Sequence, residues 1–235
     1  MSDKHLSSQF DAELGAVSTR VLEMGGMAEA QVAQALGALA QLDGEAAAGV
    51  LAQEARINQM EVRIDADLWL IVARRQPTAR DLRLLVAVSK AIANLERVGD
   101  EAARIARTVQ RLLDNGMSTR LRTPMDDLQF AGRLAVAQLR KALDAFARLD
   151  TEAALEVLQQ DDQIDREFDG LLRKLITFMM EDPRTISASI DLIFVAKAIE
   201  RVGDHAKNLA EATIYVVKGE DVRHNPLAAV ESMLR

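Results

Sequence analysis

The feature that most constrains the fold is a repeated run of five residues. Glu96-Arg97-Val98-Gly99-Asp100 recurs unchanged as residues 200–204, which is 104 positions later (200 − 96). Each copy lies in a long run where apolar residues return every three or four positions, the spacing of an amphipathic helix. A helical unit of this length has therefore been duplicated, and the chain is expected to form two similar domains.

The composition is typical of long helices packed through aliphatic side chains. Hydrophobic residues make up 49% of the 235 residues but aromatic residues only 3%, with 4 Pro and 12 Gly. The net charge of −7 argues against a nucleic-acid partner, which requires clustered Lys and Arg. Cysteine is absent, which excludes disulfide bonds and thiolate metal sites. Without an apolar span or a secretory signal, a soluble cytoplasmic protein is expected.

Periodicity and turn residues predict an all-α fold with six long helices. The predicted helices are residues 6–42, 45–75, 79–113, a fourth capped by Asp126 or Asp127 and ending near Leu149, 152–181 and 187–218. The first has a weak point at Gly25-Gly26, and a short apolar tail follows at 227–234. The polar segment 117–124 predicts the link between domains. We therefore expect a tandem duplication of two antiparallel three-helix bundles, residues 1–116 and 117–235.

The repeated motif contains two locally unfavourable choices. Glu96 and Asp100 are four residues apart, so their carboxylates lie side by side on a helix, where like charges cost a few tenths of a kcal/mol. Gly99 lies between them, and glycine in a helix interior costs about 1 kcal/mol relative to Ala. Because both choices are made twice, they indicate a binding site or close helix packing.

Hairpin geometry places further acidic residues beside each motif. The two copies can be aligned in two ways. An offset of 104 residues, the spacing of the repeated motif, matches acidic residues of the second predicted helix with acidic residues of the fifth. An offset of 107 residues matches 42–57 with 149–164 at nine identical positions in sixteen, which carries more weight. Counting back from turns at Pro77 and Pro183 supports the offset of 107. Glu61 extends the first stripe on the same helix face. The candidate ligands are Glu54, Asn58, Glu61, Glu96 and Asp100, then Asp161, Asp165, Glu200 and Asp204.

These oxygen-bearing side chains have two interpretations. They can bind metal ions, as inward-facing carboxylates do in helical bundles, or they can form acidic stripes neutralised by arginines. The doubled motif and its matched acids favour the metal interpretation; the arginines close in sequence are Arg56, Arg97, Arg104 and Arg201.

Other chemistry is less well supported. A ferritin-like di-metal enzyme needs Glu-x-x-His on two helices, and the sequence has none. His205 points about 100° away from Asp204 and is interpreted as a surface or second-shell residue. Neither a nucleophilic triad nor a nucleotide-binding loop is present, so no catalytic residue or organic cofactor is predicted.

At these motifs the sequence resembles the PhoU family of phosphate-uptake regulators. The resemblance rests on residues 95–100 and 199–204 and extends to 56–65, 75–83, 179–186 and 217–224, nearly the whole chain. It implies a fold of two similar three-helix bundles and a cytoplasmic, non-enzymatic protein. The implied partners are the phosphate ABC transporter, through its ATPase subunit, and the sensor histidine kinase, with the starvation response held off when phosphate is plentiful. A homodimer is also expected.

The family's paired acidic motifs bind metal ions, in some members as clusters of iron or zinc. Carried over by position, the resemblance assigns the metal ligands to the candidate residues above, with iron, zinc, magnesium and manganese all open. Asn58 departs from the all-acidic pattern, so the first site is expected to be weaker or completed by Glu61. No residue is assigned to phosphate binding. The alternatives are a carboxylate-bridged, metal-dependent phosphohydrolase and a purely structural helical interaction protein.

Overall fold

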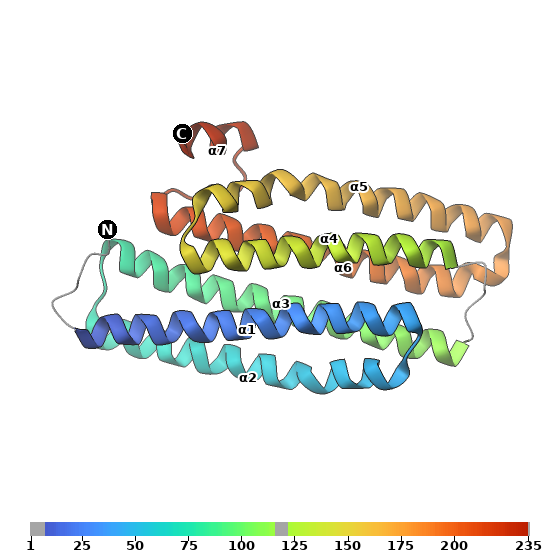
Figure 1. The fold of residues 1–235 in the computed structure, drawn as a ribbon, viewed down its shortest axis with the longest axis horizontal. Coiled ribbons are helices and arrows are strands. Elements are labelled where there is room, and N and C mark those ends of the chain that lie inside the picture. The colour runs from blue at the N-terminus through green and yellow to red at the C-terminus, as the bar shows by residue number, and fades with distance from the viewer. Residues whose placement is uncertain (1–7, 116–121, 235) are drawn as a thin grey trace.

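The computed structural model describes residues 8–115 and 122–234, and in these residues it contains helices and no strand. Six long helices confirm the predicted all-α fold (Figure 1). They are α1 (Ser8–Gln41), α2 (Gly44–Arg75), α3 (Ala79–Asn115), α4 (Arg122–Arg148), α5 (Thr151–Glu181) and α6 (Ile186–Lys218). A 3-10 turn, Pro183–Thr185, precedes α6, and the predicted apolar tail forms α7 (Leu227–Leu234).

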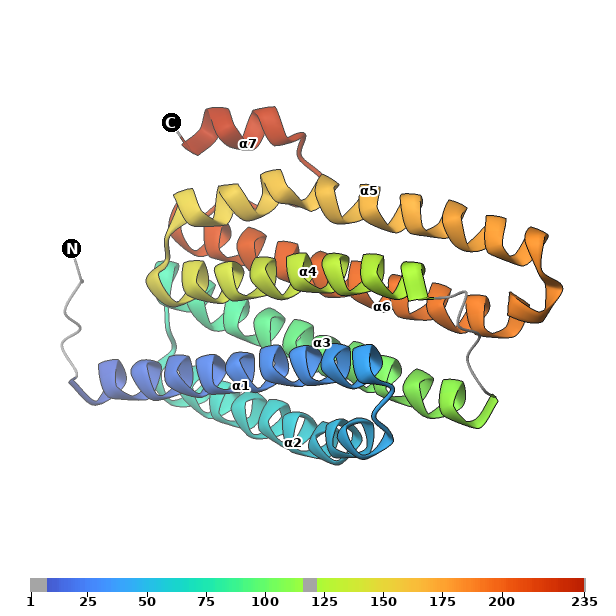
Figure 2. The ribbon, with the colours of Figure 1, turned by 45° about the vertical axis from the view of Figure 1, so that its right-hand side comes forward.

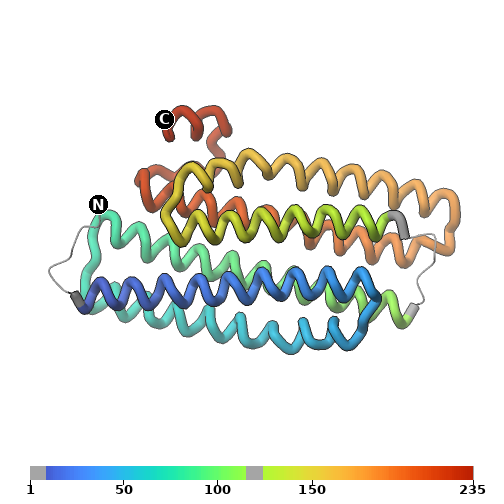
Figure 3. The backbone as a smooth tube through the Cα atoms, viewed as in Figure 1, coloured from blue at the N-terminus to red at the C-terminus, as the bar shows by residue number. Residues whose placement is uncertain are grey.

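Helices α1 to α3 form one antiparallel bundle and α4 to α6 form a second (Figures 1 and 3). The bundles meet mainly along α3 and α6, which run antiparallel through the middle of the molecule, while α1 also packs on α4. Figure 2 shows α7 beside α5, against which it packs, with Val230 buried. None of the helices in the described part of the chain has the length and apolar character needed to cross a membrane.

The turn between the first two helices of each bundle has the same hydrogen bonds in both bundles. The Asp43 side chain accepts bonds from the backbone N–H groups of residues 45 and 46 at 2.9 and 3.0 Å. Asp150 does the same for residues 152 and 153, both at 3.0 Å. The preceding residues Leu42 and Leu149 have φ angles of 50° and 52°. Because each aspartate satisfies N–H groups that a helix start leaves free, the duplicated sequence forms the same local structure twice.

Two sequence predictions near α1 and α4 need correction. Helix α4 begins at Arg122, so Asp126 and Asp127 lie inside it and do not cap it. Pro124 explains the earlier start, because proline is favoured in the first turn of a helix. The end of the predicted link therefore belongs to α4, while its residues 117–121 lie outside the described ranges. Helix α1 continues through Gly25, where a Cβ atom would lie 2.4 Å from Leu143 Cδ2, so this glycine permits close packing of α1 on α4.

The glycine of the repeated motif is also explained by close packing. A Cβ atom at Gly99 would lie 3.2 Å from Ile57 Cδ1 and 3.3 Å from Gln31 Oε1. At Gly203 the corresponding distances, to Ile164 and Gln138, are 3.0 and 3.2 Å. The helix loses about 1 kcal/mol of intrinsic propensity at each site but gains a close approach to its neighbours. The glycines therefore belong to the framework that positions the carboxylates beside them.

Candidate functional site

The predicted ligand residues lie in two rows, each on the facing sides of two neighbouring helices, and we call these rows seams. The first seam lies between α2 and α3 and consists of Glu54, Asn58, Glu61, Glu96 and Asp100. The second seam lies between α5 and α6 and consists of Asp161, Asp165, Glu200 and Asp204. Spacings of three and four residues put each set on one helix face, and the antiparallel hairpin brings two such faces together.

Carboxylates of the first seam act on one another electrostatically. Burial raises the pKa of Glu96, and the negative charges of Asp100, Glu61 and Glu54 raise it further. The pKa of Glu61 is likewise raised by burial and then by Asp65, while Arg97 lowers it and Asp100 makes the smallest contribution. Carboxylates from α2 and α3 are therefore close enough to raise one another's pKa values, as expected from their predicted positions on facing sides of the hairpin. Asn58 is half-buried on α2, one turn after Glu54.

The second seam behaves in the same way. Burial raises the pKa of Asp165, with Asp161 and Glu200 adding to the shift. The pKa of Asp204 is raised by burial, then by Glu200 and Asp161. Asp161 is itself buried, with 9% of its side-chain surface exposed. The four acidic residues predicted to converge on this hairpin do lie within one another's electrostatic reach.

Ion pairs reduce the charge of both seams. Arg107 Nη2 lies 2.8 and 2.9 Å from the two oxygens of Glu54. In the second seam, Lys207 Nζ lies 2.5 Å from Asp161 Oδ2, and Lys197 Nζ lies 2.5 Å from Glu200 Oε1. The sequence interpretation missed these three cations. Hairpin counting from Pro183 would have placed Lys207 level with residue 159, two positions before Asp161.

The arginines that the sequence suggested for this role mostly bind elsewhere. Arg97 lies 3.5 Å from Glu96, but its side chain is 69% exposed, so this pair contributes little. Arg104 and Arg201 instead pair with Glu101, at 3.3 and 3.1 Å. The ion-pair interpretation of the seams therefore holds in part, with different cations from those expected.

The seams retain features that fit a metal ion. Carboxylate and amide oxygens are the donors that hard cations prefer. The Oε2 atom of Glu200 is buried and has no hydrogen-bond partner, although its Oε1 atom binds Lys197. In the described residues, no three Asp, Glu or His side chains are arranged closely enough to hold a metal as they stand. Binding would therefore require these side chains to turn inward and the lysines to move away.

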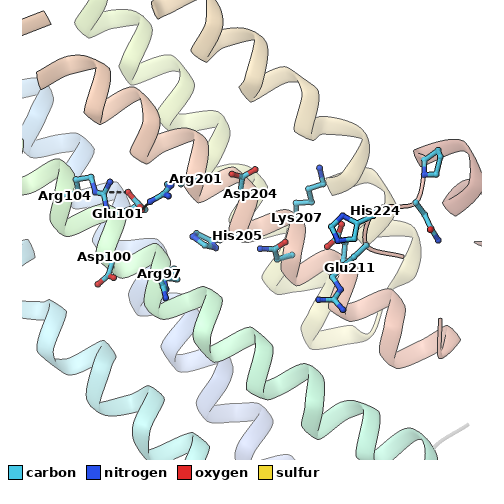
Figure 4. Close-up of a pocket in the computed structure, with 14 residues that line it drawn as sticks. Arg97, Asp100, Glu101, Arg104, Arg201, Asp204, His205, Lys207, Glu211 and His224 are labelled. Carbon is cyan, nitrogen blue, oxygen red and sulfur yellow. Dashed lines mark hydrogen bonds and ion pairs between the residues drawn. The ribbon is translucent and has the colours of Figure 1, made fainter. Parts of the chain in front are cut away.

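A cavity of about 800 Å³ lies between the two bundles and borders both seams (Figure 4). His205 lines this cavity, half-buried between α3 and α6, so the prediction of a surface position is wrong; a second-shell role stays a prediction. The turn of about 100° away from Asp204 directs the ring toward the other bundle. Its Nδ1 atom lies 2.9 Å from Asn94 Oδ1. Burial lowers its pKa to about 4, and the positive charges of Arg201 and Arg97 contribute.

Comparison with known proteins gives consistent matches. A family model described as the PhoU domain matches residues 21–109 and 128–213, one range in each bundle. A phosphate-specific transport system accessory protein PhoU homolog from Burkholderia sp is 51% identical over 226 residues, covering 95% of this chain and 95% of the relative. The phosphate-specific transport system accessory protein PhoU of Escherichia coli (strain K12) is 42% identical over 222 residues, covering 94% and 90%.

Solved structures agree. The crystal structure of PhoU from Pseudomonas aeruginosa superposes with a TM-score of 0.85 at 44% identity, covering 90% of this chain and 100% of that one. A phosphate transport system regulatory protein PhoU from Streptococcus pneumoniae gives a TM-score of 0.82 at 29% identity, with coverage of 91% and 99%. The arrangement of the two bundles is thus shared with both structures.

Proposed function

The chain belongs to the PhoU family, and we propose that it is an accessory regulator of phosphate transport. The observation that carries this proposal is the extent of the match. Both bundles match the PhoU domain, and relatives named as accessory proteins of the phosphate-specific transport system align along at least 93% of this chain.

We further propose that the protein works in the cytoplasm and couples the phosphate ABC transporter to the sensor histidine kinase. It would contact the ATPase subunit of the transporter, act as a homodimer, and repress the starvation response when phosphate is plentiful. This finer role rests on the family resemblance. The long helical faces of the two bundles suit it, because rigid helices can transmit a change at one contact surface to another.

Metal ions in the seams are part of the proposal. Support comes from the raised pKa values of Glu96, Asp165 and Asp204, and from the buried, unpartnered oxygen of Glu200. A divalent or trivalent cation such as iron, zinc, magnesium or manganese would neutralise charge that the neighbouring lysines and arginines leave uncompensated. The carboxylates would hold the ion and thereby fix the spacing of the helices in each hairpin.

The decisive test of the regulatory role is genetic. Deleting the gene should switch on phosphate-starvation genes in phosphate-rich medium, and the wild-type chain should restore repression. An Asp100→Ala/Asp204→Ala variant tests the seams, with Asp144→Ala on the exposed face of α4 as the control. If deletion leaves the starvation genes silent, the regulatory proposal is wrong.

A second test addresses the enzymatic alternative. Purified, metal-loaded protein should leave phosphoesters intact, because a regulator needs no turnover. Hydrolysis that disappears in Glu96→Ala would instead identify a metal-dependent phosphohydrolase.

A further inference from the structure

The cavity between the bundles contains a cluster of charged groups that the seams do not use. Its walls come from α3, α6 and the segment that leads into α7 (Figure 4). At one end, Arg104 from α3 and Arg201 from α6 flank Glu101, and Arg97 also lines the cavity. At this end the cavity thus brings cationic side chains from both bundles to the Glu101 carboxylate.

Glu101 is shared by two arginines. Its Oε1 atom accepts a hydrogen bond from Arg201 Nη1 at 3.1 Å, and its Oε2 atom forms an ion pair with Arg104 Nε at 3.3 Å. The Arg104 and Arg201 side chains remain 44% and 47% exposed. Each guanidinium carries five N–H groups, so most of these donors remain available to a ligand. Two positive charges on one negative charge leave a local excess that suits an anion.

Acidic groups set a limit on which anion can enter. Asp100 and Asp204 line the cavity at its borders with the two seams, and Glu101 lies inside it with 3% of its surface exposed. The Glu101 Oε2 atom is buried and, apart from its ion pair with Arg104, accepts no hydrogen bond. A carboxylate oxygen can only accept hydrogen bonds. A ligand that completes this site must therefore accept bonds from arginines and also donate one to Glu101.

His205 supplies a second acceptor. Asn208 donates a hydrogen bond to Asn94 Oδ1 at 2.9 Å, so that oxygen acts as an acceptor, and the His205 Nδ1–H group also donates to it. In that tautomer the ring's other nitrogen, Nε2, carries a lone pair. The cavity therefore offers acceptors from both bundles alongside its arginine donors.

We propose that this cavity binds a phosphate group that carries a proton. The arginines would bind its unprotonated oxygens, and Glu101 Oε2 would accept the hydrogen bond of its P–OH group. A phosphomonoester loses its last proton near pH 6, so part of its population keeps a P–OH group at neutral pH, whereas every inorganic phosphate ion keeps at least one. Sulfate has the same shape but carries no proton, so it would place a lone pair against the Glu101 carboxylate. The site should therefore distinguish the two anions.

The ligand can be inorganic phosphate or a small phosphomonoester, since about 800 Å³ has room for either. Calorimetric titration of the full chain, treated with a chelator to empty the seams, would compare inorganic phosphate, AMP and sulfate at pH 7. Either phosphate compound should bind at least about tenfold more tightly than sulfate. Tighter binding of AMP would identify a phosphomonoester as the ligand. If neither binds, or if sulfate binds equally well, the proposal is wrong.

Variants test the roles of the charged groups. Glu101→Gln keeps the shape but removes the negative charge, so the preference for phosphate over sulfate should largely disappear. Arg201→Gln should weaken binding of phosphate and sulfate alike by about tenfold. Arg148→Gln, on an exposed part of α4, is the matched control and should bind like wild type. An unchanged preference in Glu101→Gln would overturn the proposal.

The wild-type comparison of phosphate with sulfate remains decisive even if a variant fails to fold. The inference also stands apart from the proposed coupling of transporter and kinase. Binding is a property of this chain alone, so its failure would leave the genetic test of regulation unaffected.

Discussion

The buried glutamine beside each repeated motif makes the same hydrogen bond in both bundles. Gln31 Nε2 donates to the carbonyl of Val50 at 3.0 Å, and Gln138 Nε2 donates to that of Val157 at 3.1 Å. The motif glycines pack against these glutamines in both copies. Changes here would create an unpaired polar group or a steric clash in the core, which explains why the two frameworks remain alike.

The cations that neutralise the seams differ between the bundles. In the first, Arg107 holds Glu54, whereas in the second Lys207 holds the equivalent Asp161. The counterpart of Lys207, 104 positions earlier, is Ala103. The Arg107 and Lys207 side chains are 49% and 40% exposed, so a cation from another position can take over this role at small cost as long as the carboxylate keeps a partner. Two copies of one fold can therefore have seams of different charge and different affinity for metal.

The largest predicted effect is on the shared framework. Gly203→Val should reduce the free energy of unfolding by about 3 kcal/mol, because its side chain would overlap Ile164 and Gln138. Gly99→Val should cost slightly less, since its neighbours are 0.1 to 0.2 Å farther away. Denaturant titration measures both. Gly170→Val, with nothing within 4 Å of its Cβ position, is the control and should be neutral or stabilising. Equal stability of all three variants would contradict the packing argument.

The next effect separates the two seams. Lys207→Met should destabilise the metal-free protein by about 2 kcal/mol, since it leaves the buried Asp161 carboxylate without its partner. Arg107→Met should cost less, because the Glu54 side chain is 25% exposed and can be solvated. Thermal unfolding in the presence of a chelator measures the difference. Lys174→Met, which removes an exposed ion pair with Asp127, is the control. A larger cost for Arg107→Met would reverse this ranking.

A smaller effect concerns the residue that follows each motif, Glu101 in one copy and His205 in the other. The folded pKa of His205, about 4, lies below the unfolded value of 6.5. Its contribution to stability is therefore fully present above pH 6.5 and is lost as the pH falls toward 4. Wild type should lose on the order of 1 kcal/mol more than His205→Asn between pH 7 and pH 5. Parallel stability curves for the two proteins would rule this out; His224→Asn is the exposed control.

The smallest effect is a predicted stabilisation. The pKa of the Glu96 carboxyl group is raised by burial and by the charges of Asp100 and Glu61. Glu96→Gln removes this unfavourable charge, so the free energy of unfolding of the metal-free protein should rise by a few tenths of a kcal/mol at pH 7. A raised carboxyl pKa means that ionisation costs stability, so the gain should vanish as the pH falls and Glu96 becomes protonated. Glu200→Gln should give no gain because it also loses the ion pair with Lys197. Denaturation midpoints measured from pH 7 down to pH 4 test this prediction. A loss of stability in Glu96→Gln at pH 7 would contradict it.

Much of the fold could be predicted from the sequence. Helix limits could be predicted from the spacing of apolar residues and from residues that interrupt helices, such as Asp43, Asp150 and Pro183, because their effects are local. The proximity of Asp161 to Asp204 across the hairpin could be predicted by counting residues back from the turn, because residues equidistant from the turn lie level in an antiparallel hairpin. Both successes depend on geometry within one hairpin.

What failed depends on contacts between hairpins or on long side chains. The position of His205 is set by how the two bundles dock, which the spacing of one helix does not specify. The choice of Lys207 over the nearby arginines depends on side-chain reach and on competition from Glu101, which holds Arg104 and Arg201. Several cations can pair with the same carboxylate at similar energy, and the spacing of residues in the sequence does not rank these partners.

Metal binding by each seam tests the central claim most directly. Chelator-treated protein would be titrated with zinc, manganese and magnesium ions, and bound metal measured after dialysis for wild type and two double variants. Glu200→Ala/Asp204→Ala should lose the tighter site and Glu96→Ala/Asp100→Ala the weaker one, each keeping the other, because the first seam has the neutral Asn58 where the second has the carboxylate of Asp165. If wild type binds no metal and divalent ions leave its melting temperature unchanged, the seams are ion-pair packing and the claim is wrong.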